Sequence, residues 1–311
     1  SRNVLSRALR RAFGSRWGMP RARDVGRFLD THRPQVVHAH FGSSGVRLVR
    51  FLEEHKLRVP VLIHCHGTDV ISLPYTDAEY RATFVQAADR PHTAFAANTQ
   101  FLREQIVDLG VPESKVHVIP YGLNEQFHEL PRKRRQSRPQ RLLRVIAIGR
   151  LTRWKGHHVL LDAVHEVEMR RPGCVSLTIV GDGEEQRRLV RQVEERSLSA
   201  CVVFKGAIAH NELPAIMSEH DVLVQPSIIH SETRQCESFG MTVLEAIAVG
   251  LPVIVTQSGG LPELVARECE WARIVPQDDS SALAAALTTM LDDYPEGTNE
   301  RYAGERLGAY T

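Results

Sequence analysis

The chain has 311 residues, which at the usual size of a domain predicts two domains. Hydrophobic residues make up 42% and charged residues 24%, a globular composition that argues against a disordered or fibrous chain. The formal net charge is only +2, but residues 1–27 and residues 131–144 carry +7 each, which leaves −12 for the rest. The two basic segments therefore need an explanation of their own.

The N-terminal segment predicts a basic amphipathic helix. Leu5, Leu9, Phe13 and Trp17 stand four residues apart among the arginines of residues 3–17 and would form one apolar stripe. That stripe would either pack on the first sheet or lie on an anionic membrane surface. The segment lacks the apolar core of a secretory signal, and the five cysteines form no CxxC pair. We therefore expect a cytoplasmic protein, peripheral at the inner face of the plasma membrane if the stripe contacts lipid.

Short apolar runs then alternate with amphipathic stretches. The predicted strands span residues 36–40, 61–66, 93–97, 116–120, 144–149, 176–181, 202–206, 222–225, 253–256 and 272–275. The predicted helices span residues 46–55, 100–109, 157–170, 184–195, 240–249 and 280–291. Strands that are apolar almost throughout, separated by helices, indicate parallel sheets covered on both faces. The longest apolar run, residues 246–255, is interrupted by Gly250 and Pro252 and is too short to span a bilayer.

The basic stretch over residues 131–142 separates two such runs and is the predicted linker. We therefore expect an α/β chain with one doubly wound parallel-sheet domain over residues 1–130 and a second over residues 143–311. In sheets of this kind, ligands bind at the carboxyl ends of the strands. The polar residues that follow each strand are the candidate site residues.

The most informative stretch is residues 144–156, RVIAIGRLTRWKG. A buried strand is predicted to end at Gly149, so Arg150 and Lys155 fall in the turn that leads into the next helix. Two cations beside a helix N-terminus form a site for a phosphate or diphosphate. The alternative is a solvated pair of cations in an exposed loop.

The second informative stretch is residues 236–250, CESFGMTVLEAIAVG. Glu237 precedes a helix predicted to begin near Gly240, and Glu245 lies inside that helix. Amides at the helix start would face a phosphate, namely those of Phe239, Gly240, Met241 and Thr242. Glu245 suits a diol such as a ribose, and Glu237 suits another hydroxyl-rich group. The alternative is that both acids only complement the helix dipole.

These stretches resemble the donor domain of glycosyltransferase family 4. The resemblance rests on RVIAIGRLTRWKGHHVLLDAV, LTIVGDGEEQRRL, VVFKGAI, DVLVQPS and ESFGMTVLEAIAVGLPVIVTQSGGLPELV, in this order. Its most specific element is the pair Glu237 and Glu245, with GRL and KG upstream and the GG-x-x-E of residues 259–263 downstream. The runs VVHAHFG, LIHCHGTDV and ANTQFLREQIVDLGVPESKVHVIPYGLN are also family-like, so the resemblance covers roughly residues 34–295.

The resemblance implies the GT-B fold, in which two Rossmann-like domains face each other across a cleft. It implies retaining transfer of a hexose from a UDP-sugar or GDP-sugar to a saccharide or lipid-linked acceptor. It implies no tightly bound cofactor, and because the chain has no D-x-D motif, no metal at the diphosphate. HAHFG and HCHGTDV resemble runs in bacterial exopolysaccharide and cell-surface glycan enzymes.

The resemblance also implies roles for the donor-side residues. Arg150 and Lys155 would hold the diphosphate and stabilise it as the leaving group, which is the electrostatic assistance that this bond cleavage needs. Glu237 would contact sugar hydroxyls near the reacting carbon, and Glu245 would bind the ribose. The amides of residues 239–242 would meet the sugar and phosphates.

Further roles fall on five other positions. Ala207 and Ile208, just past the VVFKG strand, would lie near the base. From the first domain, His66 would reach the donor sugar. Gly42 and Ser43 would lie in a loop near the phosphates or the acceptor.

Two other functions remain open. A nucleotide-sugar-binding remnant or fragment without transfer activity is one, because only about thirty-five residues precede VVHAHFG. Family members carry further strands there, so we expect the first domain to be short of N-terminal strands and the tail to stop before a long final helix. The other is a sister GT-B enzyme, such as a phosphorylase or a sugar epimerase.

A metal-dependent hydrolase and a nucleic-acid-binding protein are not favoured. His38 with His40 and His64 with His66 put two imidazoles on one face of each strand end, and four imidazoles would suit zinc. However, the carboxylate spacing of H-x-H-x-D hydrolases is missing, so we predict no metal ligands. Neither basic segment has interleaved aromatic residues or a DNA-binding motif, so no nucleic-acid partner is expected.

Overall fold

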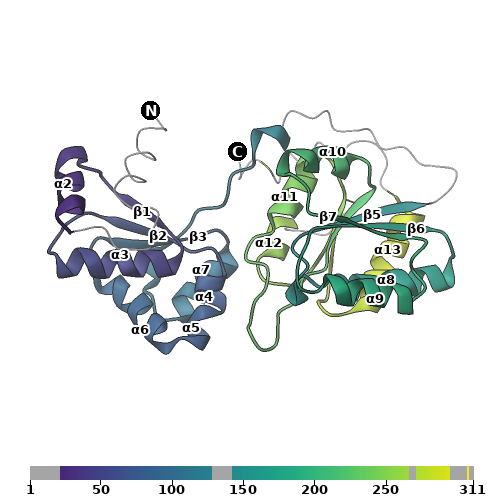
Figure 1. The fold of residues 1–311 in the computed structure, drawn as a ribbon, viewed down its shortest axis with the longest axis horizontal. Helices are drawn as coiled ribbons and strands as arrows, with labels where there is room; N and C mark the ends of the chain where they lie inside the picture. The colour runs from purple at the N-terminus through teal and green to yellow at the C-terminus, as the bar shows by residue number, and fades with distance from the viewer. Residues whose placement is uncertain (1–21, 128–141, 266–270, 295–306, 308–311) are drawn as a thin grey trace. The chain divides into compact units, whose positions relative to one another are not determined.

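The computed structural model describes residues 22–127, 142–265, 271–294 and 307 (Figure 1). The predicted helix over residues 3–17, most of the predicted linker and most of the C-terminal tail lie outside these residues. Two compact units divide the chain: residues 1–97 with 103–118, and residues 98–102 with 119–311. The predicted boundary at residues 131–142 stays a prediction.

The first unit holds a four-stranded parallel sheet of order β1-β2-β3-β4. Its strands are β1 (Val37–His40), β2 (Val61–His64), β3 (Thr93–Ala97) and β4 (Val116–Val118). Its helices are α2 (Ala22–His32), α3 (Gly42–Glu54), α4 (Thr68–Ile71), α5 (Leu73–Thr76), α6 (Ala78–Gln86), the 3-10 turns η1 (Ala87–Asp89) and η2 (Glu113–Lys115), and α7 (Gln100–Asp108), whose first three residues belong to the second unit. Ile63, Phe84 and Phe95 are fully buried in its core.

The second unit holds a six-stranded parallel sheet of order β10-β9-β8-β5-β6-β7. Its strands are β5 (Leu143–Ile148), β6 (Val175–Val180), β7 (Val202–Gly206), β8 (Val222–Gln225), β9 (Val253–Thr256) and β10 (Ala272–Val275). Its helices are α8 (His157–Arg170), α9 (Gln186–Glu195), α10 (Leu213–Ser218), α11 (Met241–Ala248), α12 (Leu261–Val265) and α13 (Ser280–Asp292), with 3-10 turns η3 (Glu125–Phe127), η4 (Arg153–Lys155) and η5 (His210–Glu212).

Helices cover both faces of this second sheet (Figure 1). Val145 packs in a cluster with residues of α8, α9 and α13, whereas its neighbour Ile146 packs in a second cluster with residues of α10, α11 and α12. Successive side chains of a strand point to opposite faces, so a strand between two helical layers must be apolar at nearly every position. That requirement is the physical basis of the strand prediction, and the expected α/β architecture is confirmed.

Three predicted boundaries in the first unit are wrong by two residues or more. The strands expected over residues 61–66 and 116–120 end at His64 and Val118. The helix expected over residues 46–55 begins at Gly42, so Gly42 and Ser43 form its first turn instead of a loop. Phe41, with φ of 69°, makes the turn from β1 into this helix. The polar run Gly-Ser-Ser-Gly hid the helix start, because it has no apolar periodicity.

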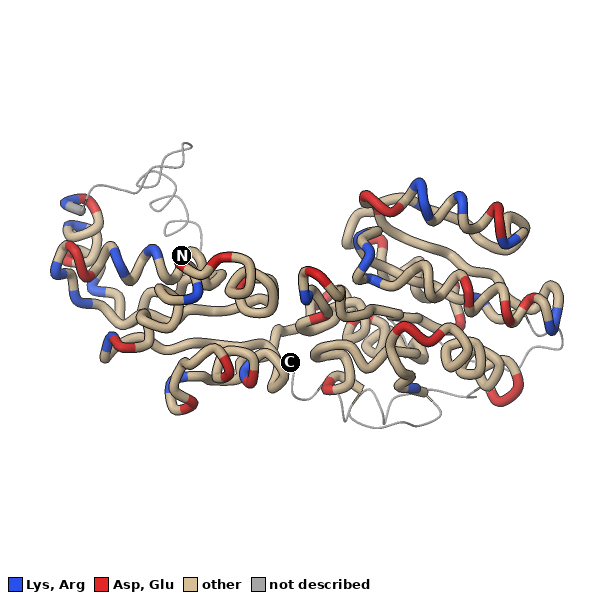
Figure 2. Tube along the Cα trace, turned by 90° about the horizontal axis from the view of Figure 1, so that it is seen from below, with Lys and Arg blue, Asp and Glu red and all other residues tan. Residues whose placement is uncertain are grey.

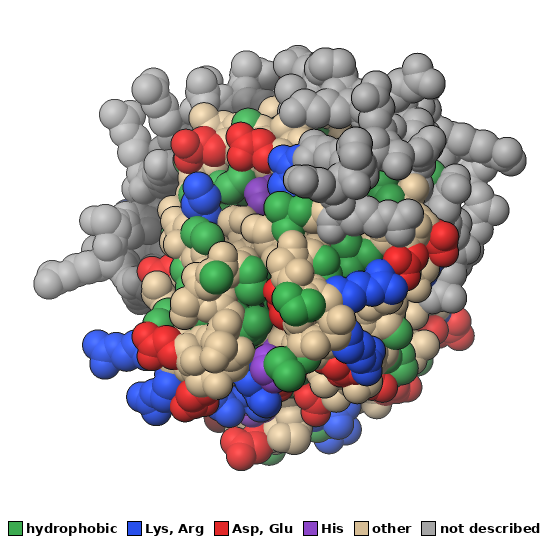
Figure 3. Space-filling model, turned by 90° about the vertical axis from the view of Figure 1, so that its right-hand side faces the viewer, with side chains coloured by type: hydrophobic (Ala, Val, Ile, Leu, Met, Phe, Trp, Pro, Cys, Tyr) green, Lys and Arg blue, Asp and Glu red, His purple; other side chains and the backbone are tan. Residues whose placement is uncertain are grey.

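Charged residues are spread along the chain of both units (Figure 2), and within the strands they are only Arg144, Lys205 and Arg273. On the face of the second unit that Figure 3 draws, acidic and basic side chains are interspersed without a large patch of one sign. Ion pairs of this unit include Arg170 with Glu166 and Arg171 with Asp292, both 2.6 Å apart. Within the described ranges, no helix combines the length and apolar character needed to cross a membrane.

Candidate functional site

The order of the second sheet marks one place for a ligand. β5 lies between β8 and β6, and the chain runs from β5 outward to β6 and β7 but from β8 outward to β9 and β10. The carboxyl ends of β5 and β8 therefore meet at a topological switch point, where parallel sheets of this kind bind ligands. Arg150 and Lys155 follow β5, and Glu237 lies between β8 and α11.

Lys155 and Glu237 form an ion pair at this point. The Lys155 Nζ atom lies 2.5 Å from Glu237 Oε2, and the two side chains are only 13% and 11% exposed. The Lys155 ammonium also lies 4.6 Å from the centre of the Trp154 ring. A pair so well shielded from water interacts more strongly than an exposed pair, because the local dielectric constant is lower. Arg150, in contrast, is exposed at the end of β5.

Gly156 brings the loop after β5 against the end of β8. Its φ is +71°, and a Cβ there would stand 1.8 Å from the Pro226 carbonyl oxygen. The Ile228 amide donates a hydrogen bond of 2.8 Å to the Trp154 carbonyl. Only glycine allows this close approach, which fixes Lys155 beside the residues that follow β8.

Two polar residues that sequence reasoning missed, Gln225 and Ser227, contact Glu237. Gln225 Nε2 donates to Ser227 Oγ at 2.9 Å and to Glu237 Oε2 at 3.3 Å. Thr242 Oγ1 donates to Gln225 Oε1 at 3.1 Å. Gln225 and Ser227 are 1% and 0% exposed. Glutamine and serine at the end of the apolar run DVLVQPS were the available signal, since a buried polar residue needs a partner.

The N-terminus of α11 lies beside this ion pair. Gly240, with φ of +101°, is the N-cap, and Met241 and Thr242 are the first helical residues. The Phe239 side chain is buried and packs against Tyr121, with ring centroids 5.0 Å apart. Because the first amides of a helix point along its axis, this end of α11 carries a partial positive charge. Residues 239–242 thus lie at the start of this helix, as expected from the sequence.

Gly259 and Gly260 hold the backbone of Glu237 in place. The Gly260 amide donates to the Glu237 carbonyl at 2.8 Å. Gly259 has φ of +57°, and a Cβ there would stand 1.9 Å from the same carbonyl oxygen. The two glycines of the GG-x-x-E run therefore pack directly on the backbone of Glu237, in the segment that leads into α11.

Glu245 is buried on α11 and contacts His210. Its Oε1 atom lies 2.7 Å from His210 Nε2, and the residue is 2% exposed. Burial raises the pKa of Glu245, and the hydrogen bond from His210 opposes that rise. Gln126 Nε2 lies 2.9 Å from His210 Nδ1 and so orients the ring. No motif marks His210, which follows β7 by four residues.

Ala207 and Ile208 come directly after β7. Ala207 is exposed, and Ile208 is half-buried against the cluster that includes residues of α10 and α11. The same loop carries His210 and hence contacts Glu245. The structure thus connects the predicted base-side residues to the predicted ribose-side residue.

In the first unit, Asp69 ties together the predicted residues Gly42 and His66. Its carboxylate accepts hydrogen bonds from the amides of Gly42 at 2.6 Å, His66 at 3.0 Å and Gly67 at 2.9 Å. The Gly42 amide is therefore already bonded within the protein, while Ser43 follows it in the first turn of α3. Asp69 is 4% exposed, and its place in the HGTD run gave no sign of this role.

Four histidines gather at the carboxyl ends of β1 and β2. His38 Nε2 lies 3.2 Å from His64 Nδ1, and His40 Nδ1 lies 3.1 Å from His66 Nε2. Burial, followed by the neighbouring His66, His38 and His40, lowers the pKa of His64 to about 4. Burial and the neighbouring His40 also lower the pKa of His38. These two imidazoles are therefore neutral at pH 7.

The described part of the chain buries three carboxylates, those of Asp69, Glu237 and Glu245. Each has polar partners, because an unpaired charge in the interior costs several kcal/mol. Glu237 and Glu245 were candidate site residues in the sequence analysis, whereas Asp69 was not.

Two family models match the chain and together cover most of it. The model described as Glycosyl transferases group 1 matches residues 131–306, and the model described as Glycosyltransferase Family 4 matches residues 2–127. The first match alone covers more than half of the 311 residues. The match over residues 2–127 spans nearly all of the first structural unit, and the match over residues 131–306 spans most of the second.

Curated relatives agree with these matches. WcaL of Escherichia coli K12, which its name assigns to colanic acid biosynthesis as a glycosyltransferase, is 29% identical over 84% of this chain and 63% of its own length. WcaL of Salmonella typhimurium LT2 is 30% identical over 81% of this chain and 60% of its own length. The amylovoran biosynthesis glycosyltransferase AmsK of Erwinia amylovora is 27% identical over 80% and 59%. The chain thus spans about three fifths of the length of these relatives.

Solved structures share the fold. Anabaena HepE, crystallised with UDP, superposes with a TM-score of 0.74 at 22% identity, over 93% of this chain and 76% of that one. Sucrose-phosphate synthase of Thermosynechococcus elongatus superposes with a TM-score of 0.70 at 22% identity, over 96% and 77%. These likenesses, with the two parallel sheets, establish the GT-B fold. On the model match over residues 131–306, the chain belongs to the group 1 glycosyl transferases, and its residues 2–127 match the Glycosyltransferase Family 4 model.

Proposed function

We propose that this chain transfers a hexose, with retention of configuration, from a nucleoside diphosphate sugar to a saccharide or lipid-linked acceptor. Its family and the names of its relatives in colanic acid and amylovoran biosynthesis support a role in a bacterial exopolysaccharide or cell-surface glycan. The cytoplasmic face of the membrane, where nucleotide sugars are available, is the proposed location. The donor nucleotide is UDP or GDP.

The buried ion pair between Lys155 and Glu237 carries this proposal. A cation, a carboxylate and a helix N-terminus stand together at the one switch point of the second sheet within the described ranges. The cation and the helix N-terminus suit a diphosphate, and the carboxylate suits sugar hydroxyls. In this arrangement Lys155 and Arg150 bind the diphosphate, while Glu237 turns from Lys155 to the sugar as the donor enters.

The chemistry breaks the bond between the anomeric carbon and the diphosphate oxygen. The bonding electron pair leaves with the diphosphate, whose growing negative charge Lys155 and Arg150 stabilise. The acceptor hydroxyl oxygen forms its bond to the anomeric carbon on the same face. Its proton passes to the departing phosphate oxygen, so no separate base is needed.

The remaining residues bind the rest of the donor. Glu245 accepts hydrogen bonds from the ribose diol, and His210 holds its carboxylate in position. Residues 207 and 208 border the base, and residues 239–242 meet the sugar and phosphates. From the first unit, His66 contacts the sugar, and Gly42 and Ser43 lie near the phosphates or the acceptor.

Calorimetric titration with UDP and GDP tests the diphosphate site. Arg150→Ala removes an exposed cation, and Lys155→Ala removes the shielded one. Because a charged hydrogen bond contributes about 1.5–3 kcal/mol, each variant is expected to weaken nucleotide binding about tenfold or more. Lys205→Ala, which removes an exposed lysine of β7, is the matched control and is expected to bind as the parent does.

Unchanged affinity in both site variants would overturn the diphosphate assignment. Transfer is then measured separately, as release of UDP or GDP from the matching sugar nucleotides in the presence of oligosaccharide acceptors. Nucleotide binding without acceptor-dependent release would favour a nucleotide-sugar-binding remnant. Release of sugar phosphate instead of nucleoside diphosphate would favour a different reaction.

A further inference from the structure

The register of the first sheet gathers histidines on one face. β1 and β2 are parallel neighbours, and His40 stands opposite His64. His38 precedes His40 by two residues and therefore points to the same face. Ala39 and Ile63 alternate with them and point into the core, where they are 9% and 0% exposed. The three imidazoles are therefore held by two hydrogen-bonded strands and not by a loop.

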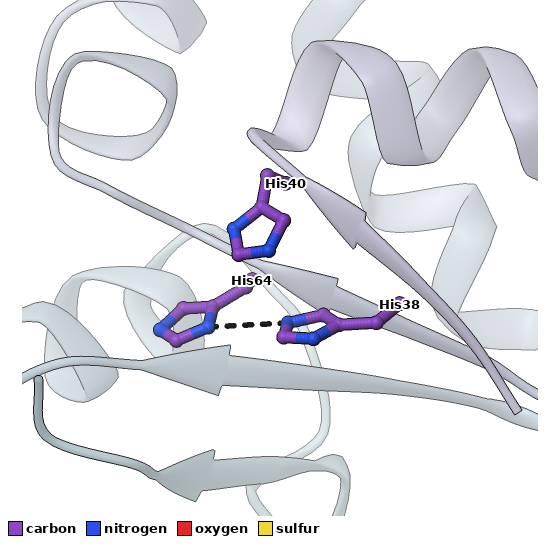
Figure 4. Close-up of side chains that lie close together, drawn as sticks. All are labelled: His38, His40 and His64. Atoms are coloured by element: carbon purple, nitrogen blue, oxygen red, sulfur yellow. Dashed lines mark hydrogen bonds between the residues drawn. The ribbon is translucent and has the colours of Figure 1, made fainter. Parts of the chain in front are cut away.

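The separations between the ring nitrogens suit coordination of a single ion. His38, His40 and His64 each offer one nitrogen, and these three atoms all lie within 4.8 Å of one another. His38 Nε2 and His64 Nδ1, the pair joined by the dashed line in Figure 4, lie 3.2 Å apart. Two nitrogens bound to one tetrahedral Zn²⁺ at about 2.0–2.1 Å stand about 3.3 Å apart. This pair therefore already has the separation of two zinc ligands, and His40 offers a third nitrogen within the same 4.8 Å cluster.

We propose that His38, His40 and His64 bind a Zn²⁺ ion and leave its fourth position open. Imidazole nitrogens suit zinc and other late transition metals, whereas Mg²⁺ and Ca²⁺ take oxygen ligands, which this cluster does not offer. Three protein ligands with one open position bind water or an oxygen of a hydroxyl-rich ligand. The site departs from the sequence prediction of no metal ligands, which rested on the missing carboxylate spacing.

The neighbourhood of the three imidazoles supports such a site. His66 Nε2 lies 3.1 Å from His40 Nδ1 and orients that ring, as residues around a metal site usually do. The His66 backbone is fixed in turn by its amide hydrogen bond to Asp69. His38 and His40 are exposed, whereas His64 is 5% exposed, so one side of the cluster is open to solvent. An ion can therefore enter without unfolding of the unit.

Binding of Zn²⁺ alone to the whole chain, prepared without a polyhistidine tag, tests this site. Equilibrium dialysis with metal analysis gives the stoichiometry and affinity, and Co²⁺ substitution gives a visible spectrum that reports tetrahedral coordination. His38→Ala and His40→Ala each remove an exposed ligand. His117→Ala is the matched control, because it removes an exposed histidine from β4 of the same sheet.

The parent chain and His117→Ala are expected to bind one Zn²⁺ and to give a tetrahedral Co²⁺ spectrum. His38→Ala and His40→Ala are expected to lose the spectrum and to bind Zn²⁺ at least tenfold more weakly. Circular dichroism checks that each variant is folded. The variants are made at the exposed His38 and His40 because His64 is buried, and His64→Ala could fail to fold for that reason alone. No bound Zn²⁺ in the parent, or equal binding in the two ligand variants and the control, would overturn the proposal.

Discussion

Lys155 Nζ lies 2.5 Å from Glu237 Oε2, although 82 residues separate them in the chain. The contact joins the turn after β5 to the segment before α11, at the carboxyl ends of two neighbouring strands. A carboxylate that neutralises the cation also keeps it in place until an anion arrives. On the proposed function, this ion pair is the state without donor, and a bound diphosphate takes the place of the Glu237 carboxylate at Lys155.

The energetic coupling of this pair is measurable. Lys155→Met leaves the Glu237 carboxylate shielded without its cation, so we expect the free energy of unfolding to fall by roughly 1–3 kcal/mol. Adding Glu237→Gln removes the stranded charge, so the double variant is expected to recover part of that loss. Urea unfolding of the parent, both single variants and the double variant gives the coupling energy, and additive losses would show that the pair contributes nothing.

Glu237 is expected to act on transfer more than on nucleotide binding. Its proposed partners are sugar hydroxyls near the reacting carbon, so Glu237→Gln should lower the rate of sugar release at least tenfold while the affinity for UDP or GDP changes less. Rates and affinities are measured on the same preparations. Equal losses in rate and affinity would remove its sugar-contacting role.

Glu245 is expected to recognise the ribose. The parent should bind the ribonucleoside diphosphate about tenfold more tightly than its 2′-deoxy analogue, because a diol donates two hydrogen bonds to a carboxylate. Glu245→Gln should narrow that preference, whereas Glu219→Gln, an exposed acid in the same unit, should leave it intact. Competition titration gives the ratio, and an unchanged preference in Glu245→Gln would place the ribose elsewhere.

A comparison of alanine substitutions at two glycines distinguishes the cost of a steric clash from the cost of a strained backbone. Gly156 and Gly173 have φ of +71° and +75°, but a Cβ at Gly156 would stand 1.8 Å from Pro226 O, whereas one at Gly173 meets nothing within 4 Å. Gly173→Ala is expected to lower the free energy of unfolding by about 1–2 kcal/mol, the cost of the left-handed conformation. Gly156→Ala is expected to cost clearly more and to weaken nucleotide binding, because it moves Lys155. Equal costs by urea unfolding would contradict the packing argument.

His157 makes the stability depend on pH. Burial, then the nearby charges of Lys155 and His158, lower the pKa of His157 to about 3, from 6.5 in the unfolded chain. As the pH falls below 6.5, His157 is protonated in the unfolded state but stays neutral in the folded state. The free energy of unfolding therefore decreases between pH 6.5 and about 3. The slope from this residue is roughly 1 kcal/mol per pH unit.

His157→Leu is expected to reduce that slope, measured as the free energy of urea unfolding at pH 7, 6 and 5. His117→Leu, at an exposed position of β4, is the control and should leave the slope unchanged. Parallel pH profiles for His157→Leu and the parent would show that the buried imidazole does not govern acid stability.

Much of the fold follows from the sequence because buried parallel strands leave a plain signal. The runs at residues 202–206, 222–225, 253–256 and 272–275 coincide with the observed β7, β8, β9 and β10. Helix α6 carried only a short signal, Tyr80 and Phe84 four residues apart, and was missed. Short helices such as this depend on tertiary packing more than on their own periodicity.

The candidate site residues were proposed from the sequence, but their contacts could not be predicted from it. Arg150 and Lys155 were predicted as a pair, yet Lys155 contacts Glu237 and Arg150 is exposed. Strand order decides this pairing, because β8 lies beside β5 although the chain reaches it only after β6 and β7. Gln225 was not singled out within the run DVLVQPS, and His210 belongs to no motif. Only the three-dimensional packing shows that they contact the two glutamates.

The most direct test of the central claim is a thermal-shift panel with UDP, GDP and their hexose conjugates. A ligand that binds only the folded state raises the unfolding temperature in proportion to the logarithm of its concentration over its Kd. We predict that one nucleotide and its sugars stabilise the parent chain, and that Arg150→Ala shows a clearly smaller shift. No shift with any member of the panel, at millimolar concentration, would contradict the proposal that this chain binds a nucleotide-sugar donor.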